Sequence, residues 1–169
     1  LIPLLCLLFG LNVQGQIQNG DFELYSSCPT GFSTPWDFQL NYCTDWYIPT
    51  DGTSDYFNTC AISTNVFIPN NFAGFQEAFS GNGYTGIWAN ESFFGALFDC
   101  SNGSKTSYSR EYIQQKLDIP LTVDSIYYVT FVISLADSLG GYAVKNIGLK
   151  FSEENMQASC FRPIVATPD

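Results

Sequence analysis

The second half of the chain contains the clearest strand patterns. Residues 108–117 and 142–151 alternate between apolar and polar positions, although Lys145 interrupts the second alternation. This two-residue period is typical of half-buried β-strands. Ile126 to Leu135, IYYVTFVISL, is β-branched and aromatic, with apolar residues on both faces. We therefore expect it to be a central strand that is covered on each side.

The first half is rich in turn-forming residues and has shorter apolar runs. The pattern predicts a turn and a short strand over 17–25, and a strand over Tyr84 to Trp88 after a Gly/Asn turn. Between them, residues 26–79 are dense in Ser, Pro, Thr, Gly, Asp and Asn. We expect an elaborated loop region there, with about one strand, near 45–48. A loop region this long inside a compact domain is usually functional or cross-linked.

These patterns together predict an all-β fold. No stretch shows a sustained helical period, and no repeat of 20 to 50 residues is present. We predict an antiparallel β-sandwich with long loops at one end. Residues 16–169 are enough for one such two-layer domain.

The N-terminal segment, residues 1–15, has the pattern of a partial signal peptide. Residues 1–11 are nearly all apolar, but the run is shorter than the ~20 residues that a membrane-spanning helix needs. Val13 and Gly15 fit the small positions before a cleavage site. No initiator Met or basic segment precedes the run, so we expect the chain to begin within its signal peptide. The alternative is a buried N-terminal strand or helix.

Charge and composition argue against several classes of partner and of catalytic mechanism. A net charge of −10 argues against nucleic acid or anionic lipid as a partner. After the first segment, no apolar stretch is long enough to span a membrane, so we expect no membrane insertion of the mature domain. The chain has no His, which removes the commonest general base and metal ligand. Glycoside hydrolysis by paired carboxylates, with Glu77 and Glu111 as the obvious pair, is a disfavoured alternative. We expect the protein not to be an enzyme.

The cysteines predict disulfides. Cys6 lies in the signal segment, and the remaining five are an odd number, so at most two bridges form. In an exported protein, the first interpretation of such cysteines is that they form disulfides. The sequence leaves the pairing open, but three of them share one loop-rich stretch, where we expect at least one bridge. The candidates are Cys28, Cys43, Cys60, Cys100 and Cys160.

Several motifs resemble those of a known fold family. NGDFE at 19–23, GNGYTGIW at 81–88 and PLTVDSIYYVTFVISLAD at 120–137 are similar to strands of galactose-binding-like jelly rolls. That fold is shared by many carbohydrate-binding modules. The resemblance implies that the sandwich is a jelly roll.

Longer strings resemble a narrower group of secreted Gram-negative bacterial proteins. They are NGDFELYSSCP, DWYIPTDGTSDYFNTCA, FIPNNFAGFQEAFSGNGYTGI, REYIQQKL and NIGLKFS. The resemblance implies that the domain continues beyond residue 169, so that its C-terminal strands are missing. It also implies a C-terminal anchor or sorting domain outside this chain, and a secreted or outer-membrane-associated location at the cell surface.

The same family resemblance implies a structural calcium ion near the first strand. Asp21 and Glu23 are the matching residues, because calcium prefers carboxylate and carbonyl oxygens. The alternative is that both are solvated carboxylates of a turn.

Carbohydrate binding needs aromatic faces for stacking and planar polar groups for hydroxyls. Most aromatic residues of a sandwich lie in its core, so we favour candidates in the long loop region, where binding residues concentrate. Arg110 either holds a ligand or, as we favour, forms a structural carboxylate pair. The predicted ligand-binding residues are Trp46, Tyr47, Asp55, Tyr56 and Arg110.

The expected function is therefore a non-catalytic extracellular or cell-surface module. It binds a glycan or cell-surface polysaccharide, or mediates adhesion. The alternative is a structural spacer that holds an anchor domain away from the outer membrane.

Overall fold

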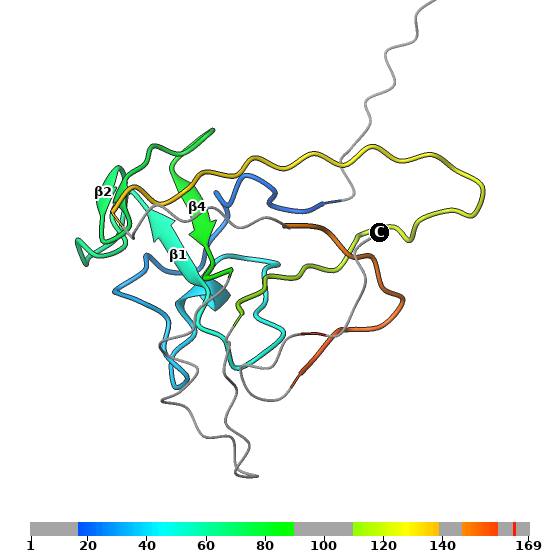
Figure 1. The fold of residues 1–169 in the computed structure, drawn as a ribbon, viewed down its shortest axis with the longest axis horizontal. Helices are drawn as coiled ribbons and strands as arrows, with labels where there is room; N and C mark the ends of the chain where they lie inside the picture. Colours follow the sequence, from blue (N-terminus) through cyan, green and yellow to red (C-terminus); the bar gives the residue numbers. More distant parts are fainter. Residues whose placement is uncertain (1–16, 90–109, 139–146, 159–163, 165–169) are drawn as a thin grey trace, which may run out of the picture.

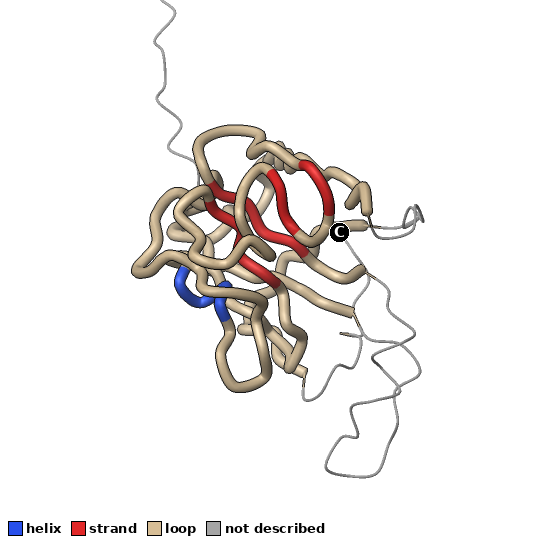
Figure 2. Tube along the Cα trace, turned by 90° about the vertical axis from the view of Figure 1, so that its left-hand side faces the viewer, coloured by secondary structure: helices blue, strands red, loops and turns tan. Residues whose placement is uncertain are grey.

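The computed structural model describes residues 17–89, 110–138, 147–158 and 164. The regular elements of this part are the 3-10 helix η1 and four short strands, and loops make up most of it (Figure 2). Regular structure is thus nearly all β, and both sheets are antiparallel, which confirms the all-β class in its coarse form. The elements are η1 (Gln39–Tyr42), β1 (Asp55–Asn58), β2 (Asn70–Asn71), β3 (Gly74–Phe75) and β4 (Gly83–Gly86).

β1 and β4 pair antiparallel and lie in the left half of the fold as Figure 1 draws it, beside β2. All four residues of β1 are buried, and the ring of Phe57 stacks on that of Tyr84 with centroids 5.0 Å apart. A Cβ atom at Gly86 would lie 2.7 Å from the Phe57 ring, so glycine at this position lets the ring cover β4. The strand predicted over Tyr84 to Trp88 is confirmed as a shorter element, whereas β1 lies where we expected loops.

The core consists of two clusters that β1 joins. Tyr56 packs with Leu40 and Cys43, and its neighbour Phe57 packs with Val66 and Ile68. Successive side chains of a strand point to opposite faces, so β1 contributes one aromatic ring to each cluster.

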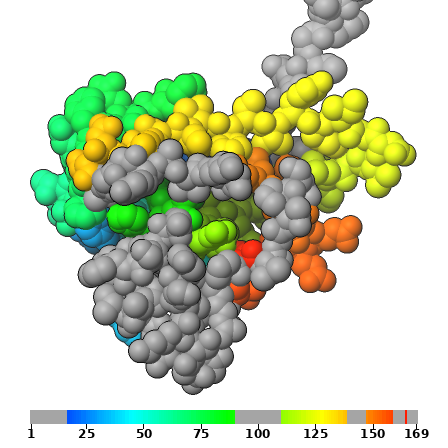
Figure 3. Space-filling model, in the orientation of Figure 1, coloured from blue at the N-terminus to red at the C-terminus, as the bar shows by residue number. Residues whose placement is uncertain are grey.

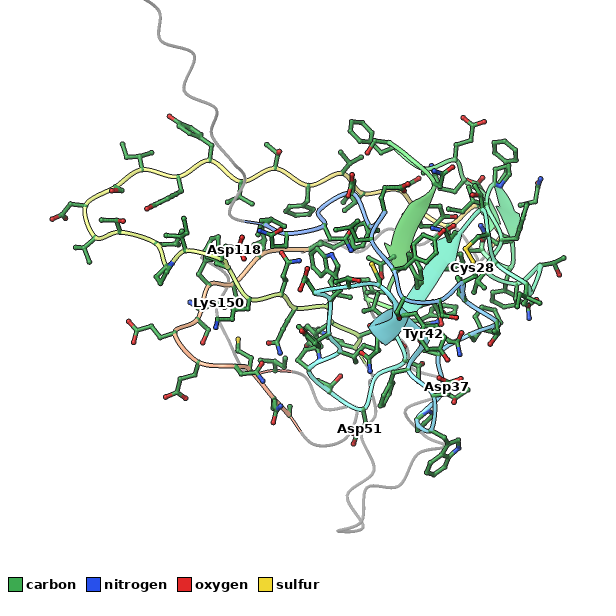
Figure 4. All side chains as sticks on the ribbon, turned by 180° about the vertical axis from the view of Figure 1, so that it is seen from behind. Cys28, Asp37, Tyr42, Asp51, Asp118 and Lys150 are labelled. Carbon is green, nitrogen blue, oxygen red and sulfur yellow. A yellow bond between two sulfur atoms is a disulfide. The ribbon has the colours of Figure 1, made fainter. Side chains whose placement is uncertain are left out.

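One disulfide closes the loop-rich stretch. Cys28 and Cys60, which are 32 residues apart, are bonded to each other, and Figure 4 marks Cys28. The bond encloses η1 and β1, and it confirms the prediction of a bridge in this stretch. Cys43 is a free, buried thiol. The other two predicted partners, Cys100 and Cys160, lie outside the described residues.

The prediction of a central, covered strand over Ile126 to Leu135 is wrong. This segment, which we call the arm (residues 126–135), is extended and forms no ladder with any residue that the structure describes, and its side chains are largely exposed. Figure 1 shows it in yellow to gold along one edge of the fold. Before the arm, Gln114 forms a β-bridge with Tyr47. After the arm, the backbone amide of Ser138 donates a hydrogen bond to the oxygen of Ala73. With its two ends held at these points, the arm runs along the surface of the fold and not between two strands (Figure 3).

The other predicted strands are reduced to single contacts. Tyr25 bridges Cys43, and Tyr47 bridges Gln114, each as an isolated antiparallel pair. Residues 147–151 form no ladder with another described residue, and 142–146, like 108–109, lie outside the described part. Within the described ranges, no helix has the length and apolarity to cross a membrane.

Candidate functional site

Three segments that are distant in sequence meet around one surface pocket. The pocket has a volume of about 210 Å³, and it is bordered by the segment that begins at residue 17, the loop after η1 and the segment before the arm. Its lining residues are Gln18, Asp45, Tyr47, Lys116, Leu117 and Asp118.

Backbone pairing places Tyr47 in this pocket. The amide of Tyr47 donates to the oxygen of Gln114, and the amide of Gln114 donates back to the oxygen of Tyr47, both at 2.9 Å. This reciprocal pair holds Tyr47 beside residues 116–118. The Tyr47 side chain is 52% exposed, so one part of it packs on the protein and the rest is available to a ligand.

Amide side chains fix the opposite wall. The Nε2 group of Gln115 donates to the backbone oxygen of Gln18, and the Nε2 group of Gln18 donates to a carboxylate oxygen of Asp118. These two bonds tie residues 17–18 to the segment before the arm. Figure 4 shows Asp118 well separated from Cys28 and Asp37.

A turn at Asp45 completes the pocket. Asp45 has a φ of 70°, a left-handed conformation that Asp adopts more readily than most residues. The next residue, Trp46, turns inward: its ring lies 4.9 Å from that of Phe22, and its Nε1 group donates to the oxygen of Asn19 at 2.8 Å. Trp46 therefore supports the loop behind Tyr47. We had predicted from the sequence that Trp46 binds ligand, but its indole ring packs inward and does not offer a free face for stacking.

The lining has the chemistry of a polyol site. It combines one aromatic ring and one aliphatic side chain with two carboxylates, an amide and an ammonium group. A ring offers a face for C–H groups, while carboxylates and amides accept or donate hydrogen bonds in fixed planes. Sequence reasoning found Tyr47 but missed Gln18, Lys116 and Asp118, because only the fold brings these residues together.

Two predicted ligand-binding residues are buried. Tyr56 is 0% exposed and its hydroxyl donates to the oxygen of Phe22 at 2.8 Å. Asp55 is buried, accepts a hydrogen bond from the Ser33 amide at 2.6 Å, and has a pKa that burial raises to about 8. A ligand at the surface would reach neither side chain. Arg110 is exposed and is not among the pocket residues.

The two carboxylates considered for hydrolysis lie in different environments. Glu111 is buried: it accepts from the Thr53 amide at 2.9 Å, the Thr53 hydroxyl at 2.8 Å and the Trp88 amide at 2.9 Å. Burial raises its pKa, and these bonds oppose the rise. Glu77 is exposed. Glu111 thus acts as a cross-link between loops.

Glu23, one of the two predicted calcium ligands, is engaged within the protein. Its two carboxylate oxygens accept from the amide and the side-chain Nδ2 of Asn82, at 2.5 and 3.0 Å. Asp21 accepts from the Glu23 amide at 3.5 Å. The described residues contain no group of three or more His, Cys, Asp or Glu that could hold a metal ion. Calcium would have to compete with Asn82 for Glu23, and the calcium site stays a prediction.

A second aromatic side chain is presented at the surface. Trp36 is 93% exposed on a turn in which Thr34 and Asp37 bond each other's backbone at 2.9 and 3.0 Å. The sequence TPWD carries a signal for this turn, since Pro favours its second position. Figure 4 marks Asp37 and Tyr42, which are hydrogen-bonded to each other beside this turn.

Comparisons with protein-family models, with curated proteins and with solved structures found no match to this chain.

Proposed function

We propose that the protein is a non-catalytic module that binds carbohydrate through the pocket around Tyr47. The observation that carries this proposal is the pocket lining, in which a half-exposed aromatic ring is bordered by Gln18, Asp45, Lys116 and Asp118. An aromatic face beside several planar hydrogen-bonding groups suits a sugar ring, which presents both C–H groups and hydroxyls. Nucleic acid is disfavoured by the net charge of −10.

The pocket size suggests a single sugar ring. Its volume of about 210 Å³ is smaller than the ~300–1,000 Å³ of typical small-molecule sites. One ring could stack on Tyr47 while its hydroxyls bond the carboxylates of Asp45 and Asp118. Lys116 and the Gln18 amide would supply donors to the ring and hydroxyl oxygens.

An exported, cell-surface setting fits this function. The Cys28–Cys60 disulfide supports an oxidising compartment, and residues 1–15 have a signal-like pattern. The two small antiparallel sheets are compatible with part of a galactose-binding-like jelly roll, the architecture that the sequence motifs suggest. A surface module of this kind would work beside an anchor or sorting domain.

The alternative is a structural spacer that binds no ligand. A glycan array separates the two, with three samples: the unchanged protein, Tyr47→Ala, and Trp36→Ala as a control for exposed aromatic rings outside the pocket. We expect the unchanged protein and Trp36→Ala to bind the same glycans, and Tyr47→Ala to lose them. Silence of the folded protein across the array would support the spacer. Loss with Trp36→Ala alone would move the site to the Thr34–Asp37 turn.

A further inference from the structure

The charges around the Tyr47 pocket are unevenly placed. The loop after η1 contributes the carboxylate of Asp45 beside the Tyr47 ring. The segment before the arm contributes both Lys116 and Asp118, whose opposite charges offset each other on that wall. Among the described residues, the lining therefore has one carboxylate more than it has cations, and Asp45 is the carboxylate on the same wall as the ring.

Two further carboxylates act near Asp45. Burial raises the pKa of the Cys43 thiol to about 12, and the charges of Asp21, Asp45 and Glu23 raise it further. All three carboxylates thus exert their field at a position two residues before Asp45. Because the fields of separate charges add, this side of the pocket has a negative potential that attracts cations.

We propose that the sugar in this pocket carries a free amino group, which is protonated and binds at Asp45; this rests on the carbohydrate site proposed for the pocket. The ammonium donates charge-assisted hydrogen bonds to the Asp45 carboxylate, and such bonds are roughly twice as strong as those of a neutral hydroxyl. A cation over the neighbouring Tyr47 ring is also attracted by the negative face of that ring.

Other classes of sugar match this wall less well. The carboxylate of an acidic sugar would meet the negative potential around Asp45, and Lys116 would attract it only from a long, exposed side chain. A neutral sugar stacks on Tyr47 without forming the ion pair, and acetylation of the amine removes the same charge. The expected order of affinity is amino sugars first, neutral and N-acetylated sugars next, and acidic sugars last.

NMR titration of the whole chain with single sugars tests this order. The probes are methyl glycosides of glucosamine, galactosamine, their N-acetyl forms, glucose, galactose and glucuronic acid. The titrations are made at about pH 6, where an amine that resembles an α-amino group, with a pKa of ~7.7–8.0, is protonated. Each amino sugar should bind about five to ten times more tightly than its neutral counterpart. This preference should shrink between ~0.1 and ~1 M salt, because the screening length falls from ~10 to ~3 Å.

Asp45→Asn tests the assignment to a residue, and Asp124→Asn is the matched control. Both positions have a left-handed φ, of 70° and 62°, which Asn adopts as readily as Asp, so neither change should disturb the backbone. The measured quantity is the ratio of the affinities for the amino sugar and the neutral sugar, which cancels any common effect on stacking. The ratio should fall below about twofold in Asp45→Asn and stay unchanged in Asp124→Asn.

The possible failures are distinguishable. Equal binding of amino and neutral sugars by the unchanged chain, or an undiminished ratio in Asp45→Asn, would overturn the amino-sugar assignment and leave the carbohydrate site standing. No binding of any sugar by the folded protein would overturn both. Nα-acetyl-lysine amide carries the same charge without a sugar ring. If it binds as tightly as the amino sugars, the pocket recognises an amine alone, and the assignment is wrong.

Discussion

The Nε1 group of Trp46 donates a hydrogen bond to the backbone oxygen of Asn19 at 2.8 Å. This contact joins the loop after η1 to the segment that begins at residue 17, and both border the Tyr47 pocket. The Asn19 side chain strengthens the same junction: its Nδ2 group donates to the oxygens of Leu24 and Thr44, each at 2.8 Å. Asn19 therefore positions the pocket without lining it.

Replacing Asn19 with Ala should destabilise the protein by about 3 kcal/mol. The change removes several hydrogen bonds of a buried amide, each contributing ~1 kcal/mol, and it leaves Ala at a φ of 47°. Urea denaturation followed by circular dichroism measures the loss. Asn41→Ala, at an exposed position, is the control and should change stability by less than about 0.5 kcal/mol. Equal effects of the two changes would contradict the role of Asn19.

Gly81 should tolerate no side chain. A Cβ atom there would lie 2.4 Å from the Glu23 carboxyl carbon, and its φ is 64°. We expect Gly81→Ala to lower the thermal midpoint by several degrees, corresponding to about 1–3 kcal/mol. Gly31→Ala is the matched control, because no atom lies within 4 Å of a Cβ built there. Similar midpoints for the two variants would show that the Glu23–Asn82 contact is not tightly packed.

Stability should fall as pH rises through the neutral range. The pKa of Asp55 is raised from 3.8 to about 8, chiefly by burial. The hydrogen bond from Ser33 lowers this pKa, and the charge of Glu111 raises it further. Between pH 4 and 8 the folded protein therefore keeps a proton that the unfolded chain has released. The free energy of unfolding should decrease by up to about 1.4 kcal/mol per pH unit in this window.

Asp55→Asn should flatten this pH dependence, because an amide keeps the acceptor for Ser33 without a titrating proton. Asp124→Asn, which changes an exposed carboxyl, should leave it unchanged. Denaturation midpoints from pH 4 to 8 provide the measurement. A slope that is the same in all three proteins would show that Asp55 does not retain its proton on folding.

The free thiol of Cys43 should react slowly, and the Cys28–Cys60 disulfide should stabilise the folded protein. Burial raises the pKa of Cys43 to about 12, so alkylation of this thiol, followed by peptide mapping, should be slow until the protein is unfolded. Replacing both Cys28 and Cys60 with Ser should cost about 3–4 kcal/mol, given the 32-residue separation. Rapid labelling of Cys43 in the folded state would contradict its place in the core.

The sequence predicted the all-β class, the strand near Tyr84 and a bridge among the first cysteines, because each has a local signal. It failed for the arm: apolar residues on both faces indicate burial, but only the fold decides whether neighbouring strands exist. It also favoured Tyr56 and Asp55 as ligand-binding residues because they lie in a loop-rich stretch. In the fold they belong to β1 and are buried.

The pocket itself had no sequence signal beyond Tyr47. Gln18 and Asp118 are separated by 100 positions, and they meet only through the Tyr47–Gln114 pairing and the Gln115 side chain. Trp46 and Tyr47 are adjacent in sequence, yet one supports the core and the other faces the pocket. Periodicity does not distinguish them in a segment without a regular strand.

The most direct test of the proposed function is calorimetric titration of the glycan that the array selects. Three proteins are compared: the unchanged chain, Tyr47→Ala, and Tyr128→Ala, which removes an exposed ring outside the pocket. We predict one site per chain and at least a tenfold loss of affinity in Tyr47→Ala, since a sugar–aromatic contact of ~1.4 kcal/mol corresponds to a factor of ten. Tyr128→Ala should bind like the unchanged chain. Undiminished binding by a folded Tyr47→Ala protein would contradict the assignment of the pocket.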